Sequence, residues 1–132
     1  MAGGYSGTPL AKTLSLRDGQ RVWFDGMPDS VADEIDEYAL DLIFSDPAKG
    51  VDAAHVFVTE RADLAAKLGT LRRQLAPDGQ VWVSWHTQSA ETDITEDAIR
   101  ELALPLGFVD TKSSAIDESW SGLKLVIRKD LR

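Results

Sequence analysis

The sequence predicts an α/β domain of three layers, in which helices cover both faces of a mostly parallel sheet of about six strands and the last strand is antiparallel. Three observations favour this fold. Short apolar runs alternate with stretches whose apolar residues recur at helical spacing. Residues 81–85 carry large apolar side chains on both faces, which is typical of a covered central strand. Residues 123–128 place Leu or Ile at every second position, which is typical of an antiparallel strand near an edge.

The first half of the chain predicts two helices among three strands. A short helical piece over residues 10–16 precedes a strand at residues 21–24. Ser30 is a good N-cap type and apolar side chains follow it at helical spacing, so the second helix is expected to begin there. Apolar runs at residues 40–44 and 55–59 predict the second and third strands.

The second half predicts two more helices and the strands between them. Thr59 is expected to cap a helix whose buried stripe consists of four leucines, Leu64, Leu68, Leu71 and Leu75. Residues 77–79 read Pro-Asp-Gly and predict a turn before the strand at residues 81–85. Thr95 is expected to cap the next helix, and a strand at residues 108–112 follows it.

Composition bounds the kind of protein. The 132 residues have the length of one domain, so residues 1–132 are expected to form a single unit. The absence of cysteine excludes disulfides, thiol nucleophiles and cysteine-based zinc sites. A net charge of −8 disfavours nucleic acid and anionic membranes as partners. With no apolar stretch long enough to span a bilayer and no signal-peptide pattern, the chain is expected in the cytoplasm.

Acidic residues concentrate in residues 25–52, which contain nine carboxylates and a single basic residue, Lys49. Such a segment is either a solvated helix face that keeps the protein dissolved or a docking surface for a basic partner. Charge patterns inform on solubility more than on fold, and the first interpretation is therefore preferred.

Residues 71–84, 104–109 and 120–129 carry three recognisable motifs. The first joins a helix to a strand through Pro-Asp-Gly, the second has Gly-Phe before a strand, and the third reads as a closing strand. These segments resemble the back half of class I S-adenosylmethionine-dependent methyltransferases, which implies a Rossmann-like fold. Residues 6–12 and 117–125 are similar to a small bacterial family of unknown function with a truncated fold of this type, and that resemblance supplies no activity.

The loop after the first predicted strand departs from the methyltransferase pattern Gly-x-Gly-x-Gly. Gly26 fits the first position, whereas Pro28 and Ser30 occupy the other two. Proline has no N–H to donate, and its ring blocks close approach of a cofactor. An acidic residue about 20 positions on usually binds the ribose in Rossmann sites, and Asp46 lies at that separation. Gly26 and Asp46 are the candidate cofactor-binding residues, although this loop leads us to expect no cofactor.

Two further places are candidates for binding a ligand or a partner. His86 follows the strand at residues 81–85, and α/β proteins place ligand groups at the ends of parallel strands. Asp117, Glu118 and Trp120 lie in the segment that joins the last two strands. They could form an acid/base site, or Trp120 could cover the sheet edge or a partner subunit. Histidines without a nearby carboxylate at ligand spacing do not predict a metal site.

Two functions stay open at this point. The first is a non-catalytic binding or scaffold domain that contacts protein partners, or a second copy of itself, through the Trp120 segment, the acidic helix or the last strands. The degenerate loop after Gly26 favours it. The alternative is a small S-adenosylmethionine-dependent methyltransferase or nucleotide-type ligand binder with a rewritten loop, which Asp46 and the methyltransferase-like motifs favour. No catalytic residue is assigned.

Overall fold

The computed structural model describes residues 8–87 and 92–132, and the sheet confirms the predicted fold class. Residues 6 and 7 of the N-terminal motif lie outside the described residues. The sheet has six strands in the order β2-β1-β3-β4-β6-β5, and β6 alone runs antiparallel to its neighbours. The strands are β1 (Arg21–Asp25), β2 (Ile43–Phe44), β3 (Val51–Phe57), β4 (Leu75–His86), β5 (Phe108–Ala115) and β6 (Trp120–Ile127).

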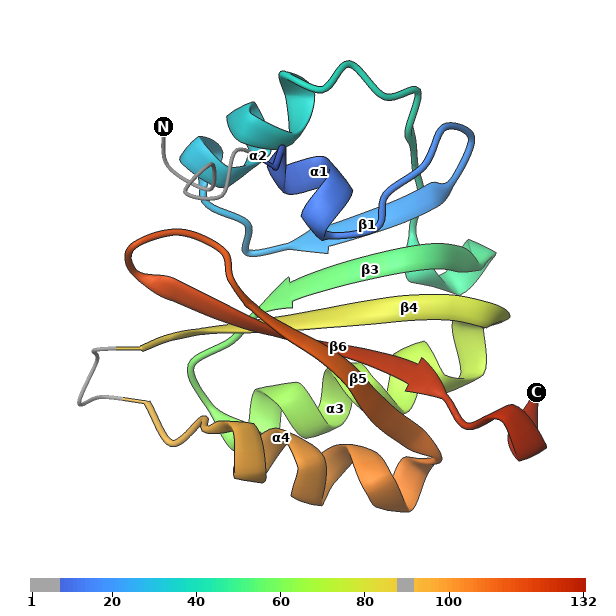
Figure 1. The fold of residues 1–132 in the computed structure, drawn as a ribbon. Helices are drawn as coiled ribbons and strands as arrows, with labels where there is room; N and C mark the ends of the chain where they lie inside the picture. The colour runs from blue at the N-terminus through green and yellow to red at the C-terminus, as the bar shows by residue number, and fades with distance from the viewer. Residues whose placement is uncertain (1–7, 88–91) are drawn as a thin grey trace.

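Helices cover both faces of this sheet, as Figure 1 shows. One layer consists of α1 (Leu10–Thr13) and α2 (Asp29–Asp36), and the other consists of α3 (Arg61–Gln74) and α4 (Glu96–Ala103). Three short 3-10 helices, η1 (Pro47–Lys49), η2 (Leu104–Leu106) and η3 (Lys129–Leu131), complete the described elements. Among the described residues, no helix combines the length and apolarity that crossing a membrane requires.

The central strand β4 supplies side chains to two hydrophobic cores, one on each face. Val81 and Val83 pack with the leucines of α3 and with Ile99 of α4. Trp82 points to the other face, where it packs among residues of α1 and α2. Its indole Nε1 donates to the carbonyl of Leu14 at 3.1 Å, so the polar group of this buried side chain is satisfied. The large alternating side chains of β4 are therefore core residues on both faces.

The predicted helix starts are correct in one case and wrong in two. Thr95 accepts a hydrogen bond from the backbone N–H of Ala98 at 3.0 Å and caps α4 as expected. Ser30 is not an N-cap, because α2 begins at Asp29 with Pro28 in the cap position. Thr59 does not cap α3, whose N-cap is Glu60. The first N–H of α3, that of Arg61, is instead satisfied by a carboxylate from the segment before α4.

Strand boundaries also differ from the prediction. The third strand begins at Val51, earlier than the apolar run suggested, because small and polar residues there still pair with β1 and β4. The Pro-Asp-Gly segment at residues 77–79 lies inside β4, where the register against β3 shifts between Val51 and Ala53. The expected turn is thus accommodated as an irregularity in a long strand.

Candidate functional site

The carboxyl ends of the parallel strands β1, β3 and β4 lie together at one end of the sheet, which we call the carboxyl edge. This is where α/β folds of this type place ligands. Gly26 follows β1 at this edge and has a φ of +69°, a conformation that favours glycine. A Cβ at this position would lie 3.2 Å from the carbonyl oxygen of Phe57, the last residue of β3. The turn and the neighbouring strand therefore require a glycine at this position whether or not a ligand binds.

The loop after Gly26 closes directly onto α2. The carbonyl of Pro28 accepts hydrogen bonds from the backbone N–H groups of Val31 and Ala32, at 3.0 and 3.1 Å. Pro28 itself contributes no N–H, so the start of α2 presents one fewer donor than a glycine loop would. Ser30 lies inside the first turn of the helix and is exposed. This arrangement lacks the bare backbone with which a glycine-rich loop approaches a nucleotide.

The carboxylate that ends β1 is already paired within the fold. Asp25 forms an ion pair with Lys67 of α3, and Lys67 also pairs with Asp63 one turn earlier. Burial alone would lower the pKa of Lys67, but the hydrogen bonds and charges of the two carboxylates outweigh burial and raise it. The ammonium group therefore stays charged and holds Asp25 against α3.

The structure does not bring Asp46 to Gly26. Strand β2 has two residues, which pair with Arg21 and Val22 at the start of β1, so β2 ends well before the edge that carries Gly26. The chain then crosses to β3 through η1, which packs against α3. The carboxylate of Asp46 accepts a hydrogen bond from the backbone N–H of Ala48 at 2.8 Å and caps η1.

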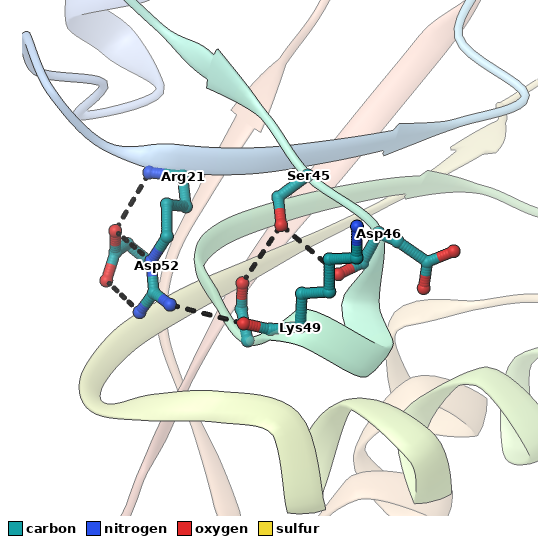
Figure 2. A network of polar contacts seen from close by, with 6 residues as sticks. Arg21, Ser45, Asp46, Lys49 and Asp52 are labelled. Atoms are coloured by element: carbon teal, nitrogen blue, oxygen red, sulfur yellow. Dashed lines mark hydrogen bonds and ion pairs between the residues drawn. The ribbon is translucent and has the colours of Figure 1, made fainter.

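Polar contacts fix this crossover at the amino-terminal end of the sheet. The Ser45 hydroxyl donates to the carbonyl of Gly50 at 3.3 Å, and the guanidinium of Arg21 donates to the carbonyl of Lys49. Arg21 also pairs with Asp52, and Figure 2 shows that the carboxylate of Asp46 points away from this pair. Burial opposes ionisation of Asp52, but its hydrogen bonds and the charge of Arg21 outweigh burial and lower its pKa. These contacts hold the chain together without leaving a ribose site.

His86 and Trp120 do meet at the carboxyl edge, as the end of β4 pairs with the start of β6. Their ring centroids lie 4.1 Å apart. The indole of Trp120 also packs edge-on against Phe57, with ring centroids 4.9 Å apart. Phe57 also lies next to Gly26. Three predicted site residues, Gly26, His86 and Trp120, therefore lie in one cluster with Phe57. The cluster is aromatic, and its contacts are those of packing rather than of proton transfer.

The two carboxylates of the β5–β6 hairpin, Asp117 and Glu118, have different roles. Oδ1 of Asp117 accepts from the backbone N–H groups of Ser119 and Trp120, at 2.8 and 2.9 Å, and so closes the turn. Glu118 is exposed. Asp117 lies near α2, where burial together with the charges of Asp117 and Glu37 raises the pKa of Glu34. The hairpin thus uses Asp117 as a structural acceptor.

The sequence did not predict a buried hydrogen-bonded pair, His55 and Ser84, that lies within the sheet. Nε2 of His55 lies 2.6 Å from Oγ of Ser84, on the neighbouring strands β3 and β4. Both side chains are buried, and burial lowers the pKa of His55 to about 3. Ser84 has no exposed surface, so its hydroxyl cannot reach a substrate. Only the strand register, which no local motif reveals, could have signalled this pair.

The described residues 8–87 and 92–132 contain no group of three or more His, Cys, Asp or Glu side chains arranged to hold a metal ion. The carboxyl edge as a whole consists of the required Gly26, the aspartate paired with Lys67 and the aromatic cluster around Phe57.

Comparison with solved structures places this fold among methyltransferases. The structure of PigF with SAH superposes with a TM-score of 0.60 at 11% identity, covering 92% of this chain and 62% of that one. The ribosomal protein L11 methylase from Lactobacillus delbrueckii subsp. bulgaricus gives 0.57 at 14% identity, covering 90% of this chain and 74% of that one. Identities this low establish the fold alone.

A third neighbour is magnesium protoporphyrin IX methyltransferase (ChlM) from Synechocystis PCC 6803 with bound SAM, with a TM-score of 0.54 at 13% identity. It covers 83% of this chain, which spans 71% of that protein. The chain thus has a methyltransferase-like fold, and it spans less than two thirds of the length of PigF.

Among curated proteins, none matches the chain significantly. One family model does match, over residues 11–129, and its description is "Protein of unknown function (DUF3052)". The match extends from α1 to η3 and so includes every strand of the sheet. The chain belongs to this family of unknown function.

Proposed function

We propose that this chain is a non-catalytic binding or scaffold domain, which keeps the sheet of a methyltransferase-like fold without using its cofactor edge. One observation carries the proposal. The carboxylate of Asp46, the residue at ribose-binding separation from Gly26, caps η1 beside the start of β1. The other polar groups of the edge are similarly engaged, since Asp25 pairs with Lys67 and Pro28 offers no donor. A nucleotide would have to displace contacts that hold the fold together.

The surface best suited to a protein partner is the outer edge of β2. Ile43 and Phe44 are 55% and 67% exposed. They occupy an edge strand whose outer backbone pairs with no other strand among residues 8–87 and 92–132. Exposed apolar side chains on a sheet edge favour pairing with another chain. The acidic helix α2 precedes this edge, so we propose a partner segment that carries basic side chains.

Two of the surfaces that the sequence suggested, the Trp120 segment and the last strands, are less suited to a partner than this edge. The indole of Trp120 is half-buried against Phe57 and His86, which leaves little of it to anchor a partner. The last strand, β6, lies between β4 and β5, so it offers no edge for self-association. Of the hairpin strands, only β5 borders the sheet, and its outward face carries polar side chains.

The alternative function, a small S-adenosylmethionine-dependent methyltransferase or nucleotide-type ligand binder, draws support from the fold and from Gly26 beside Phe57 at the carboxyl edge. Isothermal titration with S-adenosylmethionine and S-adenosylhomocysteine at millimolar concentration separates the two. We expect no heat of binding and no change in melting temperature. Saturable binding of either compound would overturn the non-catalytic proposal.

Site-specific photocrosslinking tests the β2 edge directly. Phe44 is replaced by the photoreactive analogue benzoylphenylalanine in producing cells, and Leu104, which is 49% exposed on a different element, receives the same residue as the matched control. We expect an adduct at position 44 and none at position 104. An adduct of twice the monomer mass identifies a second copy as the partner, whereas a different mass identifies another protein. Equal adducts at both positions, or none at position 44, would refute the assignment.

A further inference from the structure

Four basic side chains converge at the amino-terminal end of the sheet, on the face covered by α1 and α2. They come from α1, the loop after it, β5 and β6, and they are Lys12, Arg17, Lys112 and Lys124. Within residues 8–87 and 92–132, none of the four forms an ion pair with a carboxylate. In a protein with a net charge of −8, a group of cations without acidic partners is unexpected.

Two of these lysines stand directly opposite one another on β5 and β6. The register pairs Lys112 with Lys124, and like charges in that position destabilise a sheet. The ammonium of Lys112 donates to the carbonyl of Thr13 at 3.0 Å, and that of Lys124 to the hydroxyl of Ser15 at 3.4 Å. Burial, together with the charges of Lys112 and Arg17, lowers the pKa of Lys124. Two like charges therefore face each other across β5 and β6.

Capping of α1 accounts for only one of the four cations, Lys112, whose ammonium donates to the carbonyl of Thr13, the last residue of the helix. Helix α1 has four residues, so its dipole is weak. The carbonyl of Leu14 at its end already accepts hydrogen bonds from the side chains of Gln80 and Trp82, at 2.7 and 3.1 Å. Neutral donors thus satisfy the carbonyl of Leu14, and capping gives no reason for the charges of Lys12, Arg17 and Lys124.

Three of the four cations border a hollow of about 430 Å³. Lys12, Arg17 and Lys124 line it together with the Ser15 hydroxyl, and the exposed ring of Tyr38 forms an apolar wall. Pockets of this size hold small molecules. Asp78 is the one carboxylate among the lining residues. Ser15 has a φ of +59° because it terminates α1: its N–H donates to the carbonyl of Lys12, and the N–H of Leu16 donates to the carbonyl of Ala11, as in the usual left-handed end of a helix.

We propose that this hollow binds a small phosphorylated ligand, with Arg17 and Lys124 contacting its phosphate groups and Tyr38 bounding its remaining part. Several cations facing one cavity match a ligand with more than one negative charge, and guanidinium and ammonium groups form strong hydrogen bonds to phosphate oxygens. The acidic segment at residues 25–52 would repel a long polyanion, which favours a small molecule over nucleic acid. The site lies at the end of the sheet opposite Gly26 and does not depend on the proposed function.

Calorimetric titration with pyrophosphate at low ionic strength tests the proposal. We expect saturable binding to the wild-type protein. The affinity for pyrophosphate should be at least roughly tenfold lower in the double variant Arg17→Gln/Lys124→Gln, because each substitution removes a charge-assisted hydrogen bond to the ligand. Asp78→Asn should tighten binding by removing a like charge. The matched control is Arg73→Gln/Lys129→Gln, which removes two exposed cations elsewhere and should bind as the wild type does.

Three results would overturn the proposal: no heat with the wild-type protein at millimolar pyrophosphate, undiminished binding by the double variant, or an equal loss in the control variant. Thermal unfolding of each variant shows whether it is folded. Lys124→Gln should melt at the wild-type temperature or above it in chloride buffer, because it removes a repelled cation. Pyrophosphate should raise the melting temperature of the wild-type protein and not that of the double variant. A raised melting temperature in both proteins would also refute the site.

Discussion

The imidazole of His55 and the hydroxyl of Ser84 form a 2.6 Å hydrogen bond across β3 and β4, inside the core. Within the part of the chain that the structure describes, Nδ1 of His55 is buried without a hydrogen-bond partner. A charged imidazolium there would have neither water nor a carboxylate, which is why burial lowers the pKa of His55 to about 3. The ring is neutral in the folded protein at physiological pH.

This pair predicts a specific dependence of stability on pH. The unfolded chain binds a proton at His55 below pH 6.5, whereas the folded chain does so only near pH 3, so folding is penalised as the pH falls from 6.5. We expect the free energy of unfolding to decrease by about 1.4 kcal/mol per pH unit between pH 6 and 5. Urea denaturation of His55→Gln should show little of this slope. His86→Gln is the matched control and should keep it.

Replacing Gly26 tests whether the turn at the carboxyl edge is a structural requirement. Gly26→Ala places a Cβ 3.2 Å from the carbonyl oxygen of Phe57 at a φ of +69°, so we expect a loss of about 1–2 kcal/mol. Gly69→Ala is the control, because a Cβ in α3 meets nothing within 4 Å there. It should gain about 0.5–1 kcal/mol. Equal effects of the two substitutions in urea titrations would contradict this account.

Trp120 is expected to act as a packing residue. Trp120→Ala removes an indole that contacts Phe57 and His86, and the half-buried position suggests a loss of about 2–3 kcal/mol. Glu118→Ala, on the same hairpin and exposed, should change stability by less than about 0.5 kcal/mol. Thermal and chemical denaturation measure both. A neutral Trp120→Ala variant would return the indole to the role of an interface anchor.

Asp46 should matter for folding through its cap. Asp46→Ala leaves the N–H of Ala48 without its acceptor, and we expect a loss of about 0.5–2 kcal/mol. Asp46→Asn keeps a side-chain oxygen at this position and should retain most of the stability. Should both variants unfold at the wild-type urea concentration, the cap would contribute nothing and Asp46 would be free for another role.

Apolar periodicity predicted the layers of this protein because burial imposes it. The spacing of the leucines in α3 shows which side of the helix packs on the sheet, and the alternation along β4 shows which residues share a face of the sheet. Both patterns are local properties of the sequence. Helix starts were less predictable. The N–H of Arg61 finds its acceptor in Asp93, and no pattern around Thr59 encodes a contact made 32 residues away.

The candidate site illustrates the same limit. The separation of Gly26 and Asp46 matches a ribose-binding pattern, but the pattern assumes a second strand as long as the first. Strand β2 stops after two residues, with Phe44 paired to Val22, so the chain turns into η1 before it reaches the end of β1 that carries Gly26. Lys112 and Lys124 face each other only because β5 and β6 adopt one register. Such meetings depend on tertiary geometry, which local motifs do not determine.

The crossover from β2 to β3 affects how the sheet can assemble. Parallel strands are commonly joined by a dozen or more residues, whereas residues 45–50 suffice here because η1 takes the place of a helix. Halving a loop saves only about 0.6 kcal/mol of closure entropy, so the gain in stability is small. The kinetic gain is larger, because the short crossover keeps the sequence separation between the paired strands β1 and β3 small, and small separation favours rapid pairing. During synthesis, β1, β2 and β3 can therefore associate before the ribosome has released the C-terminal hairpin.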